Sequence, residues 1–233
     1  NHHKNSIILI GNFDGLHLGH QKLFKLALSY KKKHNSKIGV INFDPMPKMY
    51  FNNSLKNFKI SSVNQKLELL KALKVDFIIT KNFDRNFSKI KSIKFIKEIL
   101  YKKLNCKFIF VSNNFRFGNK REGDVKLLIQ NENHYNYKVI KPKPLLKSKK
   151  IVSSTIIRNL LEKGNLNRAN KFLGREWTID GIVQKGRQVG KKIGFPTCNI
   201  DIKDYVLAQP GVYAVRVLRK KNQKKLSGIA NLG

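Results

Sequence analysis

Cysteine is scarce in this chain of 233 residues, and several large-scale sequence features are missing altogether. Its two cysteines, Cys106 and Cys198, lack metal-site spacing and are too few for a disulfide framework, so a reducing cytoplasm is the expected setting. No apolar run is long enough to span a membrane, and no signal-peptide pattern or internal repeat is present. These absences exclude disulfide scaffolds, membrane-spanning proteins and repeat arrays.

Acidic residues are also few, which leaves a strongly basic chain. Against 48 Lys and Arg stand only 14 Asp and Glu, for a net charge of +34. Such a field attracts any polyanion, including RNA, anionic lipid or a nucleoside triphosphate. The lysines are scattered along the whole length, and basic runs such as residues 31–33 lack interleaved aromatics. The charge alone favours no single partner, and the scatter of the lysines leads us to expect no specific nucleic-acid surface; no membrane partner is expected either.

The first part of the chain alternates short β-rich runs with helical patterns. Amphipathic helices are expected at 21–31 and 93–104, and Ser62 with Gln65 resembles a capping box before a helix that ends near Leu73. Buried parallel strands are expected from β-branched and aromatic content at residues 7–10, 37–43, 75–80 and 108–111. This repetition predicts an open α/β sheet.

The residue pattern of the sequence changes after two further expected helices at 155–162 and 166–173. Strands and glycines dominate from there, with strands expected at 177–185, 197–202, 211–218 and 227–232. The sequence therefore predicts an α/β domain over residues 1–174 and a small β domain over residues 175–233.

A glycine-rich turn follows the first expected strand and leads directly into a helix. Its sequence is GNFDGLHLGH, from Gly11 to His20. Backbone amides and the helix dipole make such a position favourable for phosphate. His17 and His20 are spaced to share one face of a first helical turn, and Gly19 between them lets a phosphate approach the backbone. The turn is thus a candidate triphosphate site.

This turn resembles the HxGH signature of nucleotidylyltransferases, in the longer form of prokaryotic FAD synthetases. FDPMP at 43–47 resembles the family's FxPxP turn, with Met46 where many members have His. VSNNFRFG at 111–118 resembles the family's VGxDFxFG segment, with Ser112 and Asn114 in place of Gly and Asp. VSSTIIR at 152–158 is similar to the SSTxIR element, which begins a helix that Ser154 or Thr155 can cap.

The resemblance implies a Rossmann-like nucleotidylyltransferase domain in which the FMN phosphate attacks the α-phosphate of ATP, giving FAD and pyrophosphate. The imidazoles of His17 and His20 would bind the triphosphate, Arg158 the departing pyrophosphate, and Asn114 the flavin. Mg²⁺ would bridge phosphate oxygens. Further ATP-binding candidates lie in the turn and in the SSTxIR element: Gly11, Asn12, Phe13, Asp14, Gly15, Gly19, Ser153, Ser154 and Thr155.

A second motif set begins at Gly181 and ends in GFPTCNI, from Gly194 to Ile200. It resembles the GFPTxN pattern of riboflavin kinases, which implies a partial antiparallel β-barrel that phosphorylates riboflavin with ATP. Thr197 and Asn199 would ligate Mg²⁺, since alternate residues of a strand point the same way. The phosphate-binding candidates are Gly190, Lys191, Gly194 and Pro196.

The kinase resemblance also places the family's catalytic glutamate on a later strand than any in this sequence. The chain has no initiator Met and stops within a strand-like segment, so we expect both ends to be truncated. The resemblance implies little riboflavin kinase activity for these 233 residues, and both activities for the full-length parent.

Three other functions fit parts of the sequence. An HxGH adenylyltransferase for pantetheine phosphate or nicotinate mononucleotide would lack the GFPTxN segment. A class I aminoacyl-tRNA synthetase would need a larger chain and a KMSKS-type loop, which residues 147–150 match poorly. A basic RNA-binding protein is favoured by the net charge but lacks any RNA-module motif.

Overall fold

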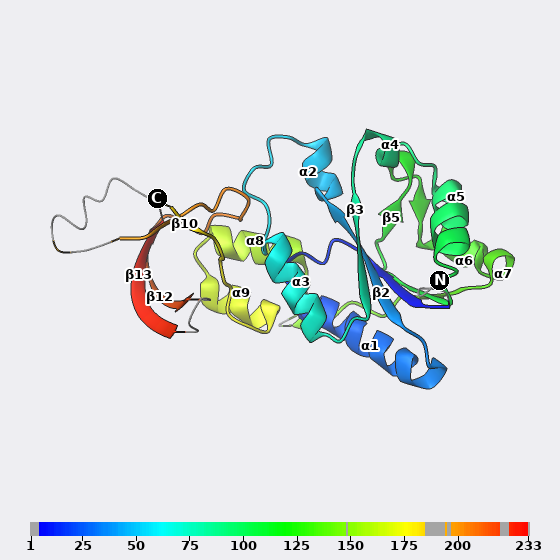
Figure 1. Ribbon diagram of the computed structural model, residues 1–233, viewed down its shortest axis with the longest axis horizontal. Helices are drawn as coiled ribbons and strands as arrows, with labels where there is room; N and C mark the ends of the chain where they lie inside the picture. Colours follow the sequence, from blue (N-terminus) through cyan, green and yellow to red (C-terminus); the bar gives the residue numbers. More distant parts are fainter. Residues whose placement is uncertain (1–4, 148, 185–193, 195–196, 220–223, 233) are drawn as a thin grey trace.

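The computed structural model describes residues 5–147, 149–184, 194, 197–219 and 224–232 (Figure 1). A twisted parallel sheet with helices on its two faces forms one end of the molecule, and the C-terminal strands form the other. Helices α8 (Ser154–Glu162) and α9 (Leu166–Leu173) lie between these two regions.

The sheet has five parallel strands in the order β3-β2-β1-β4-β7. The predicted α/β sheet is therefore confirmed, with one strand more than was predicted. Strand β3 was expected to be buried, and this is wrong, because it lies at an edge of the sheet and its side chains are half-buried or exposed. The strands are β1 (Ile7–Ile10), β2 (Ile38–Asp44), β3 (Phe77–Asn82), β4 (Phe108–Phe110) and β7 (Lys138–Ile140).

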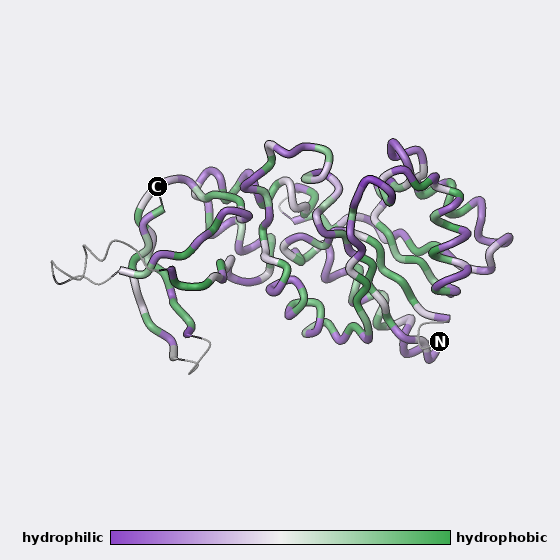
Figure 2. Tube along the Cα trace, turned by 45° about the horizontal axis from the view of Figure 1, so that its top comes forward, coloured by the Kyte–Doolittle hydropathy of each residue, from purple (hydrophilic) through white to green (hydrophobic). Residues whose placement is uncertain are grey.

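Helices cover the sheet on both faces because alternate residues of β1 point in opposite directions. Ile7 and Leu9 pack with the apolar sides of α1 (Leu18–His34) and α3 (Val63–Ala72). Ile8 and Ile10 pack on the other face, against the π-helix η2 (Phe95–Lys103) and α6 (Val125–Gln130). Hydrophobic residues accordingly follow the strands in Figure 2, while hydrophilic residues line the outer helices.

The remaining short elements connect these parts. They are η1 (Asp14–Leu16), α2 (Pro47–Phe51), α4 (Arg85–Ser88), α5 (Ser92–Lys94), β5 (Arg116–Phe117), η3 (Asn119–Arg121), β6 (Gly123–Asp124), α7 (Glu132–Tyr135), β8 (Leu146–Lys147) and β9 (Lys150–Ile151). Among the residues described, no helix combines the length and the apolar character needed to cross a membrane.

The C-terminal region holds two separate two-stranded antiparallel sheets. One pairs β10 (Val183–Gln184) with β11 (Asn199–Ile200), and the other pairs β12 (Gly211–Arg219) with β13 (Lys224–Leu232). The strand expected at 177–185 is much shorter in the described residues. The indole N–H of Trp177 donates to the carbonyl of Ile60, which holds this segment against the first region instead.

A loop of the C-terminal region also packs into the first region. Val206 lies in the same buried cluster as Ile157 and Phe172 of α8 and α9. The backbone amide of Val206 donates to Lys59, and the hydroxyl of Tyr205 donates to Gln65. Hydrogen bonds and apolar contacts thus join residues on the two sides of the expected boundary near residue 174.

Candidate nucleotide site

The turn after β1 has a backbone that few side chains tolerate. Phe13 and Gly15 both have positive φ, at 47° and 74°. A Cβ added to Gly15 would lie 2.8 Å from Cγ2 of Ile60, so only glycine fits there. Phe13 turns its buried ring inward onto Phe24 and His20. The predicted ATP contact of Phe13 could therefore come only from its backbone.

His17 and His20 share one face, as predicted. His17 caps α1 by accepting a hydrogen bond from the backbone amide of His20 at its Nδ1, over 3.3 Å. The two rings stack with centroids 3.6 Å apart and planes 18° apart. A Cβ on Gly19 would lie 3.1 Å from the His17 ring and from the carbonyl oxygen of Val152. Gly19 thus allows the close approach of the turn, the rings and the segment before α8.

Both imidazoles are neutral near pH 7. Burial lowers the pKa of His17 from 6.5 to about 4, with a smaller contribution from the positive charges of Arg158 and Arg175. Burial also lowers the pKa of His20 well below 6.5, assisted by His17 and Lys66. Because Nδ1 of His17 accepts a hydrogen bond, its proton resides on Nε2, which is then a donor. Each neutral ring carries one N–H group that it can donate to a phosphate oxygen.

Asp14 and Arg158 form a buried ion pair that fastens the turn to α8. The guanidinium Nη2 lies 2.6 Å from Oδ2 of Asp14, and both side chains are at least nine-tenths buried. The Asp14 carboxylate also accepts hydrogen bonds from the amides of Ile60 and Ser61. Arg158 stacks on the Phe58 ring and donates from Nε to the Phe58 carbonyl. These contacts give both residues a positioning role, and the predicted pyrophosphate contact of Arg158 stays a prediction.

The SSTxIR element lies directly against the same turn. Ser153 caps α8 by accepting from the amide of Ile156, so the prediction that Ser154 or Thr155 provides the cap is wrong by one or two positions. The hydroxyl of Ser154 instead donates to the backbone carbonyl of Asp14 over 3.0 Å. Thr155 is exposed. The segment and the HxGH turn are thus joined by both a hydrogen bond and an ion pair.

The flavin candidate Asn114 is exposed in the loop after β4. Its Oδ1 accepts a hydrogen bond from the hydroxyl of Ser112 over 2.9 Å. The two residues that depart from the family pattern therefore contact each other. Met46, the departure in the FxPxP turn, is buried.

Two basic residues that the sequence analysis did not single out also approach the turn. Arg175 donates from Nη1 to the carbonyl of Gly15 over 2.8 Å, and the ammonium of Lys66 donates to the carbonyl of Asn12 over 3.3 Å. A signal for Lys66 was available, because it stands at helical spacing from Leu69, Leu70 and Leu73 on an apolar face.

The kinase motif is only partly described. Gly194 has φ 84°, Thr197 is exposed, and Asn199 is exposed in β11. Gly190, Lys191 and Pro196 lie outside the described residues.

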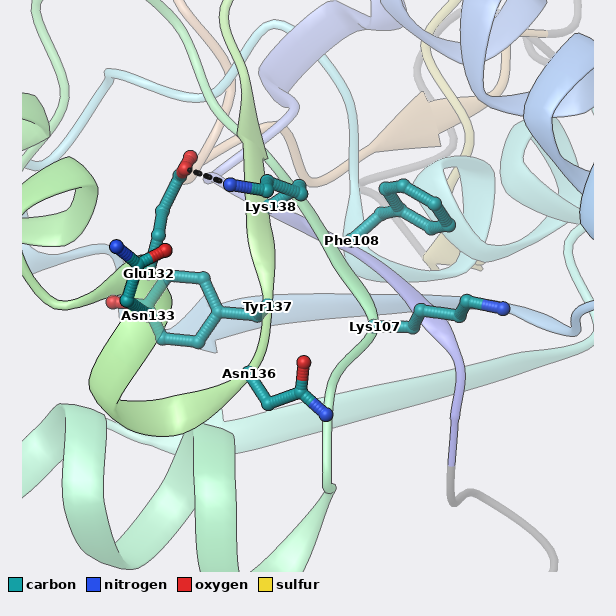
Figure 3. Close-up of a pocket in the computed structure, with 7 residues that line it drawn as sticks. All are labelled: Lys107, Phe108, Glu132, Asn133, Asn136, Tyr137 and Lys138. Carbon is teal, nitrogen blue, oxygen red and sulfur yellow. Dashed lines mark hydrogen bonds and ion pairs between the residues drawn. The ribbon is translucent and has the colours of Figure 1, made fainter.

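A surface hollow of about 270 Å³ is lined by none of these groups, and Figure 3 shows the residues that do line it. It is lined by Phe108 and Lys138, at the amino ends of β4 and β7, and by Glu132, which pairs with Lys138. Ligands of open parallel sheets bind outside the carboxyl ends of the strands, where the HxGH turn lies. The hollow is therefore no part of the candidate site.

Comparison with known proteins gives two family matches along the chain. Residues 1–156 match the family described as FAD synthetase, and residues 173–233 match the family described as riboflavin kinase. Both matches agree with the order of the motifs.

Curated relatives match almost the whole chain. A bifunctional riboflavin kinase/FMN adenylyltransferase of Buchnera aphidicola subsp. Schizaphis graminum is 41% identical over 98% of this chain and 73% of its own length. Proteins of the same name from Escherichia coli K12 and Listeria monocytogenes are 35% and 32% identical, over 97% and 98% of this chain and 72% of their own lengths.

A solved structure also resembles this chain over nearly its whole length. It is described as a macrolide-efflux protein from Streptococcus pneumoniae, with a TM-score of 0.83 and 28% identity over 99% of this chain and 74% of that one.

Proposed function

The chain belongs to the family of bifunctional riboflavin kinase/FMN adenylyltransferases, and from this premise we propose that the HxGH turn is where its α/β region transfers an adenylyl group from ATP to FMN. Flavin cofactor biosynthesis is the function of the family. The observation that carries the assignment to this turn is the stacked pair of neutral imidazoles, braced against the SSTxIR element at the carboxyl end of β1.

The reaction we propose is a direct transfer. A phosphate oxygen of FMN attacks the α-phosphorus of ATP, the bond from that phosphorus to the bridging oxygen breaks, and pyrophosphate leaves. Negative charge accumulates on phosphate oxygens in the transition state, so positioned N–H donors are what the reaction needs. We assign this to His17 and His20, with Arg158 nearest to the departing pyrophosphate.

The turn itself fits a phosphate chain. Gly11, Gly15 and Gly19 have no side chains to block it, and the backbone of Asn12 to Asp14 curves before the start of α1. Ser153, Ser154 and Thr155 precede or begin α8, so backbone amides of a second helix start face the same place. Because the Asp14 carboxylate already accepts bonds from Ile60, Ser61 and Arg158, its contribution to ATP binding would be through the shape of the turn.

Mg²⁺ is the cation that we expect with ATP, and it would be held mainly by phosphate oxygens and water. It would neutralise charge on the triphosphate while the imidazoles contact the remaining oxygens. Asn114, at the carboxyl end of the neighbouring strand β4, is our candidate for contacting the flavin through its amide nitrogen.

For the C-terminal region we propose an antiparallel barrel that houses the riboflavin kinase site. Val212 and Ile229 are apolar residues with exposed fractions of 72% and 79%. Further strands of a barrel would cover such side chains, which supports the proposal. Thr197 and Asn199 offer a hydroxyl and an amide oxygen, the hard oxygen ligands that Mg²⁺ accepts. We place the domain boundary near residue 174 and expect the enzyme in the cytoplasm.

Replacing His20 with alanine tests the proposed site. The rate of FAD formation from FMN and ATP should fall by a factor of about 10² to 10³, because one preorganised donor to the reacting phosphates is lost. The rate is followed by separating FMN from FAD chromatographically. His134→Ala is the matched control, since His134 is exposed on α7. If the His20 and His134 variants turn over equally fast, the site assignment is wrong.

A further inference from the structure

Lys66 is a cation in the interior of the protein. Its side chain belongs to the first turn of α3, where a capping box between Ser62 and Gln65 fixes the start of the helix. The residue is only 5% exposed, unlike most lysines of this chain. Its ammonium reaches the turn after β1, where it donates to the carbonyl of Asn12.

This buried charge is poorly compensated. Among the described residues, the carbonyl of Asn12 is the one hydrogen-bond acceptor of the ammonium, and no carboxylate lies within ion-pair distance of it. Asp14 and Asp44 act on it from farther away, and the Asp14 carboxylate is already bonded to Arg158. Burial lowers the pKa of Lys66, with these two carboxylates opposing the change. An ammonium has three donors, and a buried one needs an anion.

Unsatisfied polar atoms also occur near the carboxyl ends of β1 and β2. Within the described residues, three buried side-chain atoms have no hydrogen-bond partner: Oδ1 of Asn12, Nδ1 of His20 and Oδ1 of Asn42. Asn12 and Asn42 stand at the carboxyl ends of adjacent strands, and His20 is close enough to Lys66 for the two charges to interact. Each buried polar group without a hydrogen-bond partner costs free energy of folding, unless a bound ligand supplies that partner.

We propose that Lys66 is a phosphate-binding residue of the adenylyltransferase site, and that its ammonium forms an ion pair with an oxyanion of the bound substrate. The inference rests on the proposed function. It adds a positively charged donor, the Lys66 ammonium, to the two neutral imidazoles. The anion is a phosphate group, and it belongs either to the triphosphate of ATP or to the phosphate of FMN. Hydroxyl groups on the same substrate would donate to Asn12 and Asn42.

Lys66→Met keeps the length of the side chain and removes the charge. We expect kcat/KM for FAD formation to fall about 10- to 100-fold, which is the range for losing a hydrogen bond to a charged group. If the anion is the triphosphate, the loss appears in KM for ATP, and inorganic tripolyphosphate no longer raises the melting temperature of the variant. If it is the FMN phosphate, the loss appears in KM for FMN, and the stabilisation by FMN is lost instead. Lys71→Met on the same helix is the matched control, because Lys71 is 68% exposed.

The melting temperature without ligand separates binding from a structural role. Removing a poorly paired buried charge should leave that temperature unchanged or raise it, and Lys66→Arg should recover part of the lost affinity. A lower melting temperature of the ligand-free Met variant would overturn the proposal, as would unchanged kinetics with both stabilisations kept. If the unaltered protein makes no FAD, the proposed function fails first, whatever Lys66 does.

Discussion

The glycines of the HxGH turn and Gly194 of the kinase motif, one site in each region of this molecule, have opposite surroundings. In the first region, a Cβ on Gly15 or Gly19 would meet neighbouring atoms at 2.8 Å and 3.1 Å. In the second region, within the described residues, a Cβ on Gly194 would meet nothing within 4 Å. The HxGH turn is therefore closely packed at both of these glycines, whereas among the described residues the feature that favours glycine at position 194 is its positive φ.

Burial follows the same division. The buried apolar residues described after residue 174 are Tyr205, Val206 and Ala208, and Val206 packs within the cluster formed by α8 and α9. The first region therefore supplies its own core and also part of the packing of the second. A site in the first region is preorganised before its substrate arrives, which is what transfer by positioning requires.

The largest effect should come from removing the ion pair that braces the turn. Arg158→Met leaves the Asp14 carboxylate buried without its cation, so the free energy of unfolding should fall by about 3–5 kcal/mol. Urea denaturation measures this. Lys138→Met breaks the pair with Glu132, in which the lysine is 61% exposed, and should cost at most about 1 kcal/mol. Similar losses in the two variants would mean that the turn is not braced as described.

A pair of alanine substitutions tests the glycine comparison directly. Gly15→Ala adds a clash with Ile60 to a strained φ of 74°, and should lower the free energy of unfolding by about 2–4 kcal/mol. Gly194→Ala carries the φ penalty alone, about 1 kcal/mol. Chemical denaturation measures both losses. Equal losses would contradict the stated difference in packing around Gly15 and Gly194.

Much of the first region could be predicted from the sequence because its signals are local. Strand β1, the capping box at Ser62 and the shared face of His17 and His20 each depend on a few adjacent residues. Strand β7 was missed because Lys138, Val139 and Ile140 form a run of three among polar residues, and its position at the sheet edge leaves it half-buried or exposed.

The contacts that complete the site could not be predicted, because their partners are distant in sequence. Asp14 and Arg158 are separated by 144 positions, and each alone resembles an ordinary polar residue of a motif. Their pairing assigns Asp14 to the framework of the turn rather than to a free carboxylate. The strand expected from Trp177 failed for a similar reason, since the indole finds its hydrogen-bond partner at Ile60 in the first region.

A pH dependence of stability is expected for the first region alone, since all six histidines precede residue 175. Below pH 6.5 the unfolded chain takes up a proton at His17, but the folded protein does not until about pH 4. The unfolded state thus binds more protons in this window, and stability falls as the pH falls. From about pH 7.5 to about pH 5, His17 alone should lower the free energy of unfolding by about 2 kcal/mol.

Urea denaturation at both pH values should show a loss smaller by that amount in His17→Gln than in the unaltered protein. His134→Gln should retain the full loss, because its ring is exposed. An unchanged loss in His17→Gln would mean that the imidazole is already protonated in the folded site, where it would bind phosphate as a cation rather than as a neutral donor.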